Sequence, residues 1–368
     1  MDGLAAVIEG FPAGFEFDEE RINKDLARRQ IGYGTSPRTG IEKNQVIVYT
    51  GVIGGRTIGS PITLIIPNRD NRRKSWELKE KMTVPRPGHA DLAGALKYRL
   101  DDIRLVAERA SARQTAVWTA AGSLLMQFLE KFNIKVIGYV EQLGGIKVYN
   151  PTDPFSVKDS IEKSPLRIME FSMSEEIKEV IDKARQEGDT LGGMITIIIR
   201  GVPIGLGSYV HPDRRLDALL AGACMAIPSV NGVEIGNGFE MTHLTGSQTT
   251  DVIYAGERNF YRRTNHAGGI EGGISNGQDI VIHLASKPVP MIKPPNKAIN
   301  MASLEETDFP YVTSDVCVVP SVSVIAEMVV ARVIAESFLE RFGADTYEEV
   351  YERYHSYKES LEEIFENA

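Results

Sequence analysis

The sequence predicts an α+β protein with a single domain spanning residues 1–368. Short apolar runs of strand length, such as Ile62–Pro67 and residues 195–199, occur together with two long helices that have wide apolar faces. The chain has no Gly-x-Gly-x-x-Gly turn leading into a helix and no Gly-x4-Gly-Lys-Ser/Thr loop, so Rossmann and P-loop folds are disfavoured. Its 368 residues, 42 % of them apolar, are enough to bury a large core.

The N-terminal third is predicted to alternate between strands and helices. A strand is already running at residue 4, and Ile22 and Leu26 lie at helical spacing in a charged segment at 17–30. Prolines fix φ, so residues 85–89 form a rigid, non-helical loop. The other expected elements are a glycine-rich turn at 31–40, strands at 45–50 and 61–67, and a helix from Ala90.

Two helices are apolar enough to lie deep in a core. One begins near Ser111 and the other spans 323–342, with little charge before Glu336. Both follow a polar stretch, and a Gly-Gly pair precedes a strand at 192–193 and again at 272–273. These echoes favour an internal pseudo-repeat, although a chance match explains them equally well. Charged helices at 172–189 and 347–368 are expected to lie on the surface.

Composition excludes several classes of protein. The formal charge of −9 argues against nucleic-acid binding, and no apolar run approaches the roughly 18 residues of a membrane span. Cys224 and Cys317 have no metal-binding spacing and are expected to be buried, unpaired residues in a reducing cytoplasm. The acidic start is not a secretory signal. Since the first strand runs so early, we expect the N-terminal strand to be truncated.

A basic segment indicates a site for an anionic small molecule. Residues 69–113 contain twelve Lys/Arg and seven Asp/Glu in a chain that is acidic overall. Ordinary surface charge explains this excess equally well, but Arg86, His89, Arg109 and Arg113 are all expected on loops or at a helix start, where free N–H groups favour anions. His89 titrates near neutral pH and is the natural proton carrier.

Two further segments are candidates for ligand binding or catalysis. The run 265–277 is unusually rich in glycine, which allows either close approach of a ligand or tight turns. Asp315 precedes an apolar element, where a carboxylate is either a helix cap or a catalytic group. The histidines show no metal-ligand spacing, so no metal site is predicted.

Taken together, these segments resemble the chorismate synthase family. The matching stretches, in family order, are EGFPAGF (9–15), RRQIGYG (28–34), RPGHADLAGALKYR (86–99), ERASARQTA (108–116), GDTLGG (188–193), GVPIGLGSYV (201–210), NHAGGIEGGISNGQ (265–278), KPVP (287–290) and SDV (314–316). The resemblance implies a β-α-β sandwich with core helices between antiparallel sheets, assembled as a homotetramer. It also implies 1,4-anti elimination of phosphate from 5-enolpyruvylshikimate 3-phosphate, giving chorismate in the shikimate pathway of aromatic amino-acid biosynthesis.

The resemblance further implies reduced FMN as cofactor, with NADPH as a conceivable source of its electrons, and assigns roles by position. His89 matches the histidine that protonates the reduced flavin, and Asp315 matches a carboxylate near flavin N5. The FMN-contacting positions are Arg109, Ala110, Ser111, Pro228, Ser229, Gly272, Lys287, Pro288, Val289, Pro290, Met291 and Thr313. The substrate-binding positions are Arg29, Thr35, Arg38 and Arg113.

The chain departs from the family pattern at four places. The family begins with a Gly-Glu-Ser-His-Gly segment whose histidine is credited with protonating the departing phosphate, and Met1 falls immediately after the position of that histidine. Thr35 and Thr313 stand where arginines are expected. Met291 replaces a small hydroxyl residue. Two hypotheses follow: a working enzyme whose true start lies upstream, or an impaired paralogue that keeps the fold and binds flavin or an oligomer partner. A flavin oxidoreductase is disfavoured because no nicotinamide-binding fold is evident.

Overall fold

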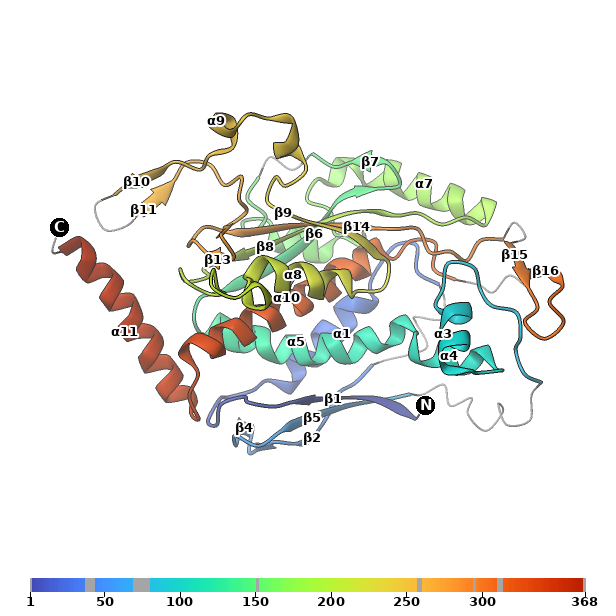
Figure 1. Cartoon of the computed structure of the whole chain (residues 1–368), viewed down its shortest axis with the longest axis horizontal. Coiled ribbons are helices and arrows are strands. Elements are labelled where there is room, and N and C mark those ends of the chain that lie inside the picture. Colours follow the sequence, from blue (N-terminus) through green and yellow to red (C-terminus); the bar gives the residue numbers. More distant parts are fainter. Residues whose placement is uncertain are drawn as a thin grey trace.

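A computed structural model describes residues 2–36, 44–68, 80–149, 152–256, 260–293, 296–309 and 314–366. These residues form three layers, with long helices between a small sheet and a larger one (Figure 1). The small sheet has the order β1-β5-β2 and is antiparallel. Its strands are β1 (Gly3–Ile8), β2 (Ile47–Thr50) and β5 (Ile62–Pro67). The layering confirms the predicted α+β class and the β-α-β sandwich.

The larger sheet has the antiparallel order β7-β6-β8-β14-β9. Its strands are β6 (Lys135–Leu143), β7 (Ile146–Lys147), β8 (Gly193–Arg200), β9 (Val230–Ile235) and β14 (Ile280–Ser286). Alternate residues point to opposite faces, so Ile195, Ile197 and Ile199 all lie fully buried on the face toward the helices. The apolar run predicted at 195–199 is therefore a core strand.

The middle layer is made by helices α1 (Glu19–Gln30), α5 (Thr115–Glu130), α8 (Leu216–Met225) and α10 (Val319–Phe342). α10 is apolar on almost every side, as expected of a helix buried between two sheets. α5 and α10 approach closely at Gly122, where an added Cβ would lie 2.4 Å from the carbonyl oxygen of Met328. Glycine at this position allows the two longest core helices to touch backbone to backbone.

Shorter elements surround these layers. The helical ones are α3 (Asp91–Tyr98), α4 (Ile103–Arg109), a 3-10 turn at Ala112–Gln114, α6 (Lys158–Lys163), α7 (Ser174–Glu187), α9 (Gly246–Thr249) and α11 (Tyr347–Glu366). The strands are β3 (Val52–Ile53), β4 (Arg56–Thr57), β10 (Ile253–Ala255), β11 (Phe260–Arg262), β12 (Ile270–Glu271), β13 (Ile274–Ser275), β15 (Asn296–Ile299) and β16 (Glu306–Phe309). All the helices and strands expected from the sequence are present, with ends shifted by a few residues. The pseudo-repeat stays a prediction.

Two expected surface helices contribute more to the core than predicted. α7 buries Ile177 and Ile181 completely, and α11 packs Tyr354 against the rings of Phe338 and Phe342. Both cysteines are buried and unbonded as expected, and burial raises each thiol pKa to about 12. No helix among the described residues is long and apolar enough to cross a membrane.

The helix contact at Gly122 is testable by adding one methyl group. Gly122→Ala is expected to lower the free energy of unfolding by about 1–3 kcal/mol, because the new Cβ overpacks the interface with α10. Gly222→Ala on α8 is the matched control. Its Cβ meets no atom within 4 Å, so the substitution should raise stability by about 0.4–1 kcal/mol. Urea unfolding measures both, and equal effects of the two variants would contradict the proposed close packing.

Candidate active site

The proline loop that carries His89 packs against the Lys-Pro-Val-Pro segment. Gly88 has a φ of +71°, and a Cβ there would lie 2.7 Å from Cβ of Pro290, so only glycine fits. The Nδ1 atom of His89 lies 3.0 Å from the carbonyl oxygen of Pro87. Because a carbonyl only accepts, Nδ1 carries the proton of this hydrogen bond. In the neutral ring, Nε2 is therefore left as the proton acceptor.

The surroundings of His89 favour its neutral form. Burial is the largest cause of its lowered pKa, and the positive charges of Arg86 and Lys287 act in the same direction. The bond to Pro87 and the carboxylate of Asp91 oppose the shift but do not outweigh it. His89 is therefore a base near neutral pH rather than a permanent cation.

Arg86 holds this loop in place. Its Nε and Nη2 atoms donate to the two carboxylate oxygens of Asp91 at 2.7 and 2.9 Å, and its backbone N–H donates to the same group. Asp91 is fully buried, which by itself raises its pKa, but the bonds from Arg86 outweigh burial and lower that pKa. The charge of Arg86 is thus neutralised by Asp91. His89, and not Arg86, is therefore the residue of this loop that is available to a ligand.

Ser229 and the segment 287–291 lie together at the end of β14. The backbone N–H of Lys287 donates to the carbonyl of Ser229 at 2.9 Å, and Thr190 Oγ1 donates to the carbonyl of Val289 at 2.7 Å. Lys287 is exposed, and no ion-pair partner for its ammonium group is found among the described residues. Two neighbouring predicted positions differ in exposure: Pro228 is half-buried, and Met291 is 8 % exposed.

The turn after α1 brings Thr35 and Asp315 together. The carbonyl of Gly34 accepts from the N–H of Val316 at 2.8 Å, and the carboxylate of Asp315 accepts from the N–H of Ser36 at 2.6 Å. Asp315 does not cap α10, which begins four residues later without a side-chain cap, so that interpretation is wrong. Asp315 instead ties down the 32–36 turn. Thr35 Oγ1 donates to the carbonyl of Gly32 within the same turn.

A third group surrounds the start of α5. Arg109 is the last residue of α4, so the expectation that it lies on a loop or at a helix start is wrong. Its Nη1 donates to the amide oxygen of Gln114. Ala110 is exposed, and the hydroxyl of Ser111 caps the 3-10 turn by accepting from the N–H of Arg113.

Two arginines link this group to the rest of the site. Arg29 donates from Nε to Thr115 Oγ1 at 2.9 Å and from Nη2 to the carbonyl of Ala112 at 3.5 Å. Arg113 donates to the side-chain oxygens of Asn68 and Asn44. The end of α1 is therefore joined to the loop that leads into α5.

Asn44 was not identified from the sequence, yet it lies beside Arg113 in the same group of residues. It is 7 % exposed, and its Nδ2 finds no acceptor among the described residues, although its Oδ1 accepts from Arg113. A buried donor without an acceptor, beside a guanidinium, suits an anionic oxygen. No periodicity or motif distinguished Asn44 from the other polar residues before the strand.

Not every predicted site residue lies near His89, Lys287 and Asp315. Gly272 lies in the β12–β13 hairpin, at the opposite end of β14 from Lys287; seven residues of strand make that separation roughly 20 Å. The FMN contact of Gly272 stays a prediction. Arg38, Thr313 and residues 69–79 of the basic segment lie outside the described residues. No group of three or more His, Cys, Asp or Glu among the described residues is arranged to hold a metal.

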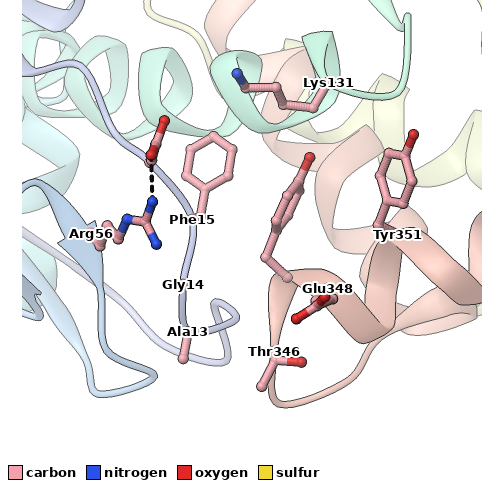
Figure 2. A pocket seen from close by; sticks show the side chains of 10 residues that line it. Ala13, Gly14, Phe15, Arg56, Lys131, Thr346, Glu348 and Tyr351 are labelled. Atoms are coloured by element: carbon pink, nitrogen blue, oxygen red, sulfur yellow. Dashed lines mark hydrogen bonds and ion pairs between the residues drawn. The ribbon is translucent and has the colours of Figure 1, made fainter.

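A separate crevice lies at the other end of α5. Figure 2 shows Arg56 on one side of it and Tyr351 on the other, with Lys131 above. Its volume is about 590 Å³, and its walls come from residues 13–16, the end of α5 and the start of α11. Since α5 has 16 residues, about 24 Å of helix separates the crevice from Arg29 and Thr115. None of the predicted site residues lines it.

Comparison with known proteins gives a consistent result. The family model described as chorismate synthase matches residues 2–339. The chain is 47 % identical to a chorismate synthase of Geotalea uraniireducens (strain Rf4), over 97 % of this chain and 96 % of that protein. It is 43 % identical to a chorismate synthase of Carboxydothermus hydrogenoformans, over 98 % and 96 %. A solved structure described as "Crystal Structure of Chorismate Synthase" superposes with a TM-score of 0.80 at 36 % identity, covering 98 % of this chain and 95 % of that one.

The neutral state of His89 has a measurable consequence. A histidine whose pKa falls on folding stabilises the fold fully above its unfolded pKa of about 6.5 and loses that contribution as pH drops. Ring titration by NMR should therefore give a midpoint below about 6.5 for His89. Urea unfolding should show a loss of stability on acidification that is reduced in His89→Gln. A midpoint at or above the usual value would contradict the burial argument.

Proposed function

The chain belongs to the chorismate synthase family, and on this premise we propose that it is a carbon–oxygen lyase forming chorismate. It would act on 5-enolpyruvylshikimate 3-phosphate by 1,4-anti elimination of phosphate. The observation that carries the proposal is that one end of the sandwich gathers His89, Asp315, Lys287 and two arginines from segments far apart in the sequence. A site rich in positive charge with one neutral base suits an anionic substrate that loses a proton.

Reduced FMN is proposed as the cofactor because the residues present fit an anionic group. The exposed ammonium of Lys287 and the buried Nδ2 of Asn44 are donors without an acceptor among the described residues, and Ser229 has a φ of +77° beside Lys287. Residues 109–111, 228–229 and 287–291 would hold the flavin. When bound, reduced FMN supplies electron density that helps phosphate leave, without net oxidation or reduction. NADPH is proposed only as a source of its electrons.

The chain's own residues bind the substrate and manage protons. Arg29 and Arg113 are proposed to hold the anionic groups of the substrate, since a guanidinium fork matches carboxylate and phosphate oxygens. Nε2 of His89 is proposed to exchange the flavin-site proton, because Nδ1 is already committed to Pro87. Asp315, whose carboxylate accepts from the N–H of Ser36, is proposed to present that carboxylate to the flavin.

Two departures from the family pattern weaken the anion site. Thr35 uses its hydroxyl to close its own turn on Gly32, so it supplies no cation there. Met291 is nearly buried and offers a thioether where a hydroxyl donor is expected. A hydrogen bond to a charged group contributes about 1.5–3 kcal/mol, so we expect weaker ligand binding than in relatives that keep these residues.

The assembly and the location of the protein are also proposals. A homotetramer is proposed from the family resemblance. A cytoplasmic location is proposed because both cysteines are buried and unpaired, which suits a reducing compartment.

The first test is anaerobic chorismate formation from 5-enolpyruvylshikimate 3-phosphate with chemically reduced FMN. Turnover is expected, with a KM raised about tenfold or more over a relative that has arginine at the position of Thr35. Thr35→Arg should recover part of that difference in KM. Substrate and flavin binding without any turnover would instead contradict the proposed activity of this chain and leave the two hypotheses from the sequence to be separated.

A second test addresses His89. His89→Asn should lower turnover by about 10²–10⁴-fold, the usual contribution of a general acid or base, while FMN binding measured by calorimetry is retained. His355→Asn is the control, because His355 also bonds a backbone carbonyl through Nδ1 but lies on α11, far along the chain. If both variants keep wild-type turnover at saturating reduced FMN, the role given to His89 is wrong.

A further inference from the structure

The end of α1 carries two adjacent arginines with different surroundings. Arg29 reaches the loop before α5, whereas Arg28 turns inward to three carboxylates. Arg28 donates from Nε and Nη2 to both oxygens of Glu162 at 2.7 and 2.6 Å. It also donates from Nη1 to Asp25 at 2.8 Å and from Nη2 to Glu327 at 2.7 Å. One guanidinium thus joins α1 to α6 and α10.

Glu327 is the second centre of this ion network. It is 2 % exposed in the middle of α10, and its other oxygen accepts from the N–H of Gly138 at 2.8 Å and from Arg167 at 2.6 Å. Arg167, also buried, donates to Ser323 Oγ, one turn earlier on α10, and to the carbonyl of Gly138 on β6. The network therefore fixes α10 to the central sheet as well as to α1.

Asp25 extends the network to α5. Its Oδ2 accepts from Ser123 Oγ at 2.6 Å, and it is 1 % exposed. Every carboxylate in the network has several donors, as buried charges require. Buried ion pairs add little net stability compared with apolar packing, but they accept only one geometry. Such a network is better suited to fixing the relative positions of helices than to stabilising them.

The elements that the network fixes are those that carry the site. Arg29 follows Arg28 directly, and a Cβ on Gly32 would lie 3.5 Å from Ser321 Oγ and 3.7 Å from Pro320 Cβ, so the turn rests on the first turn of α10. The 32–36 turn also forms hydrogen bonds with Asp315 and Val316, which lie just before α10. A shift of α1 along α10 would move Arg29 relative to Asp315.

We propose that Arg28, with Glu327 and Glu162, is a positioning residue that sets Arg29 and the 32–36 turn against Asp315. It touches neither substrate nor cofactor, and it acts through the neighbouring turn. The inference rests on the site proposed above. Lysine cannot replace Arg28 because a single ammonium cannot bond both oxygens of Glu162 and also reach Asp25 and Glu327.

The test compares Arg28→Lys with Arg21→Lys in the full chain. Arg21 lies on the same helix and also pairs with Asp25, but its other partner is Glu130, at the far end of α5 from the site. Arg28→Lys is expected to lower kcat/KM by about 10–100-fold and to weaken the calorimetric Kd for 5-enolpyruvylshikimate 3-phosphate about tenfold. Arg21→Lys should leave both within about twofold, although either variant lowers the unfolding temperature.

Two outcomes overturn the inference. In the first, Arg28→Lys folds and keeps wild-type kcat/KM and Kd, so that only its unfolding temperature changes. In the second, both variants lose activity equally. If Arg28→Lys does not fold, Glu162→Gln, at the solvent-facing edge of the network, is judged by the same criteria. Turnover by the unaltered chain is measured alongside. Its absence counts against the proposed function, while the comparison of Kd values still decides the positioning role.

Discussion

The carboxylate of Glu327 is the constraint on which the stacking of the layers depends. α10 is apolar on almost every side, and the hydrophobic effect has no direction, so burial alone does not select which face of this helix meets which neighbour. A buried charge removes that freedom. Glu327 is satisfied only where Arg28, Arg167 and the N–H of Gly138 converge, and they come from α1, the segment before α7 and β6.

The same constraint explains why the candidate site lies at one end of the sandwich. The site uses no long element of its own; it is built from the ends of α1, α4 and β14 and from the segments that lead into α5 and α10. The ends of these elements are positioned together when the layers are held in register with one another. The close contact of α5 and α10 at Gly122 and the Arg28 network both hold these helices in register, away from the site itself.

Charges in the basic segment divide into two classes. Arg86 forms an ion pair with Asp91, and Arg104 forms one with Asp102. These arginines therefore shape the loops rather than bind a ligand. Arg109 of this segment, and Lys287 outside it, by contrast contact no carboxylate among the described residues. Counting Lys and Arg along the chain cannot make this division, and family membership does not make it either. Burial, together with the positive charges of Arg86 and Lys287, lowers the pKa of His89 although an acid lies two residues away.

The sequence by itself determined the long helices and several of the strands, because the periodicity of apolar residues is a local property, and it determined the rigid His89 loop, because prolines fix φ. It did not predict β6, β9, α8 or the short hairpins. Sequence motifs such as those at 86–99 and 265–278 also identified the family and most of the candidate site residues. Only the tertiary structure decided that Arg28 faces inward while Arg29 faces the site, that Asp315 holds a turn rather than capping α10, and that Asn44 is a buried donor. The physical reason is that ion pairing depends on proximity in space, and Arg28 and Glu327 are 299 residues apart in the chain.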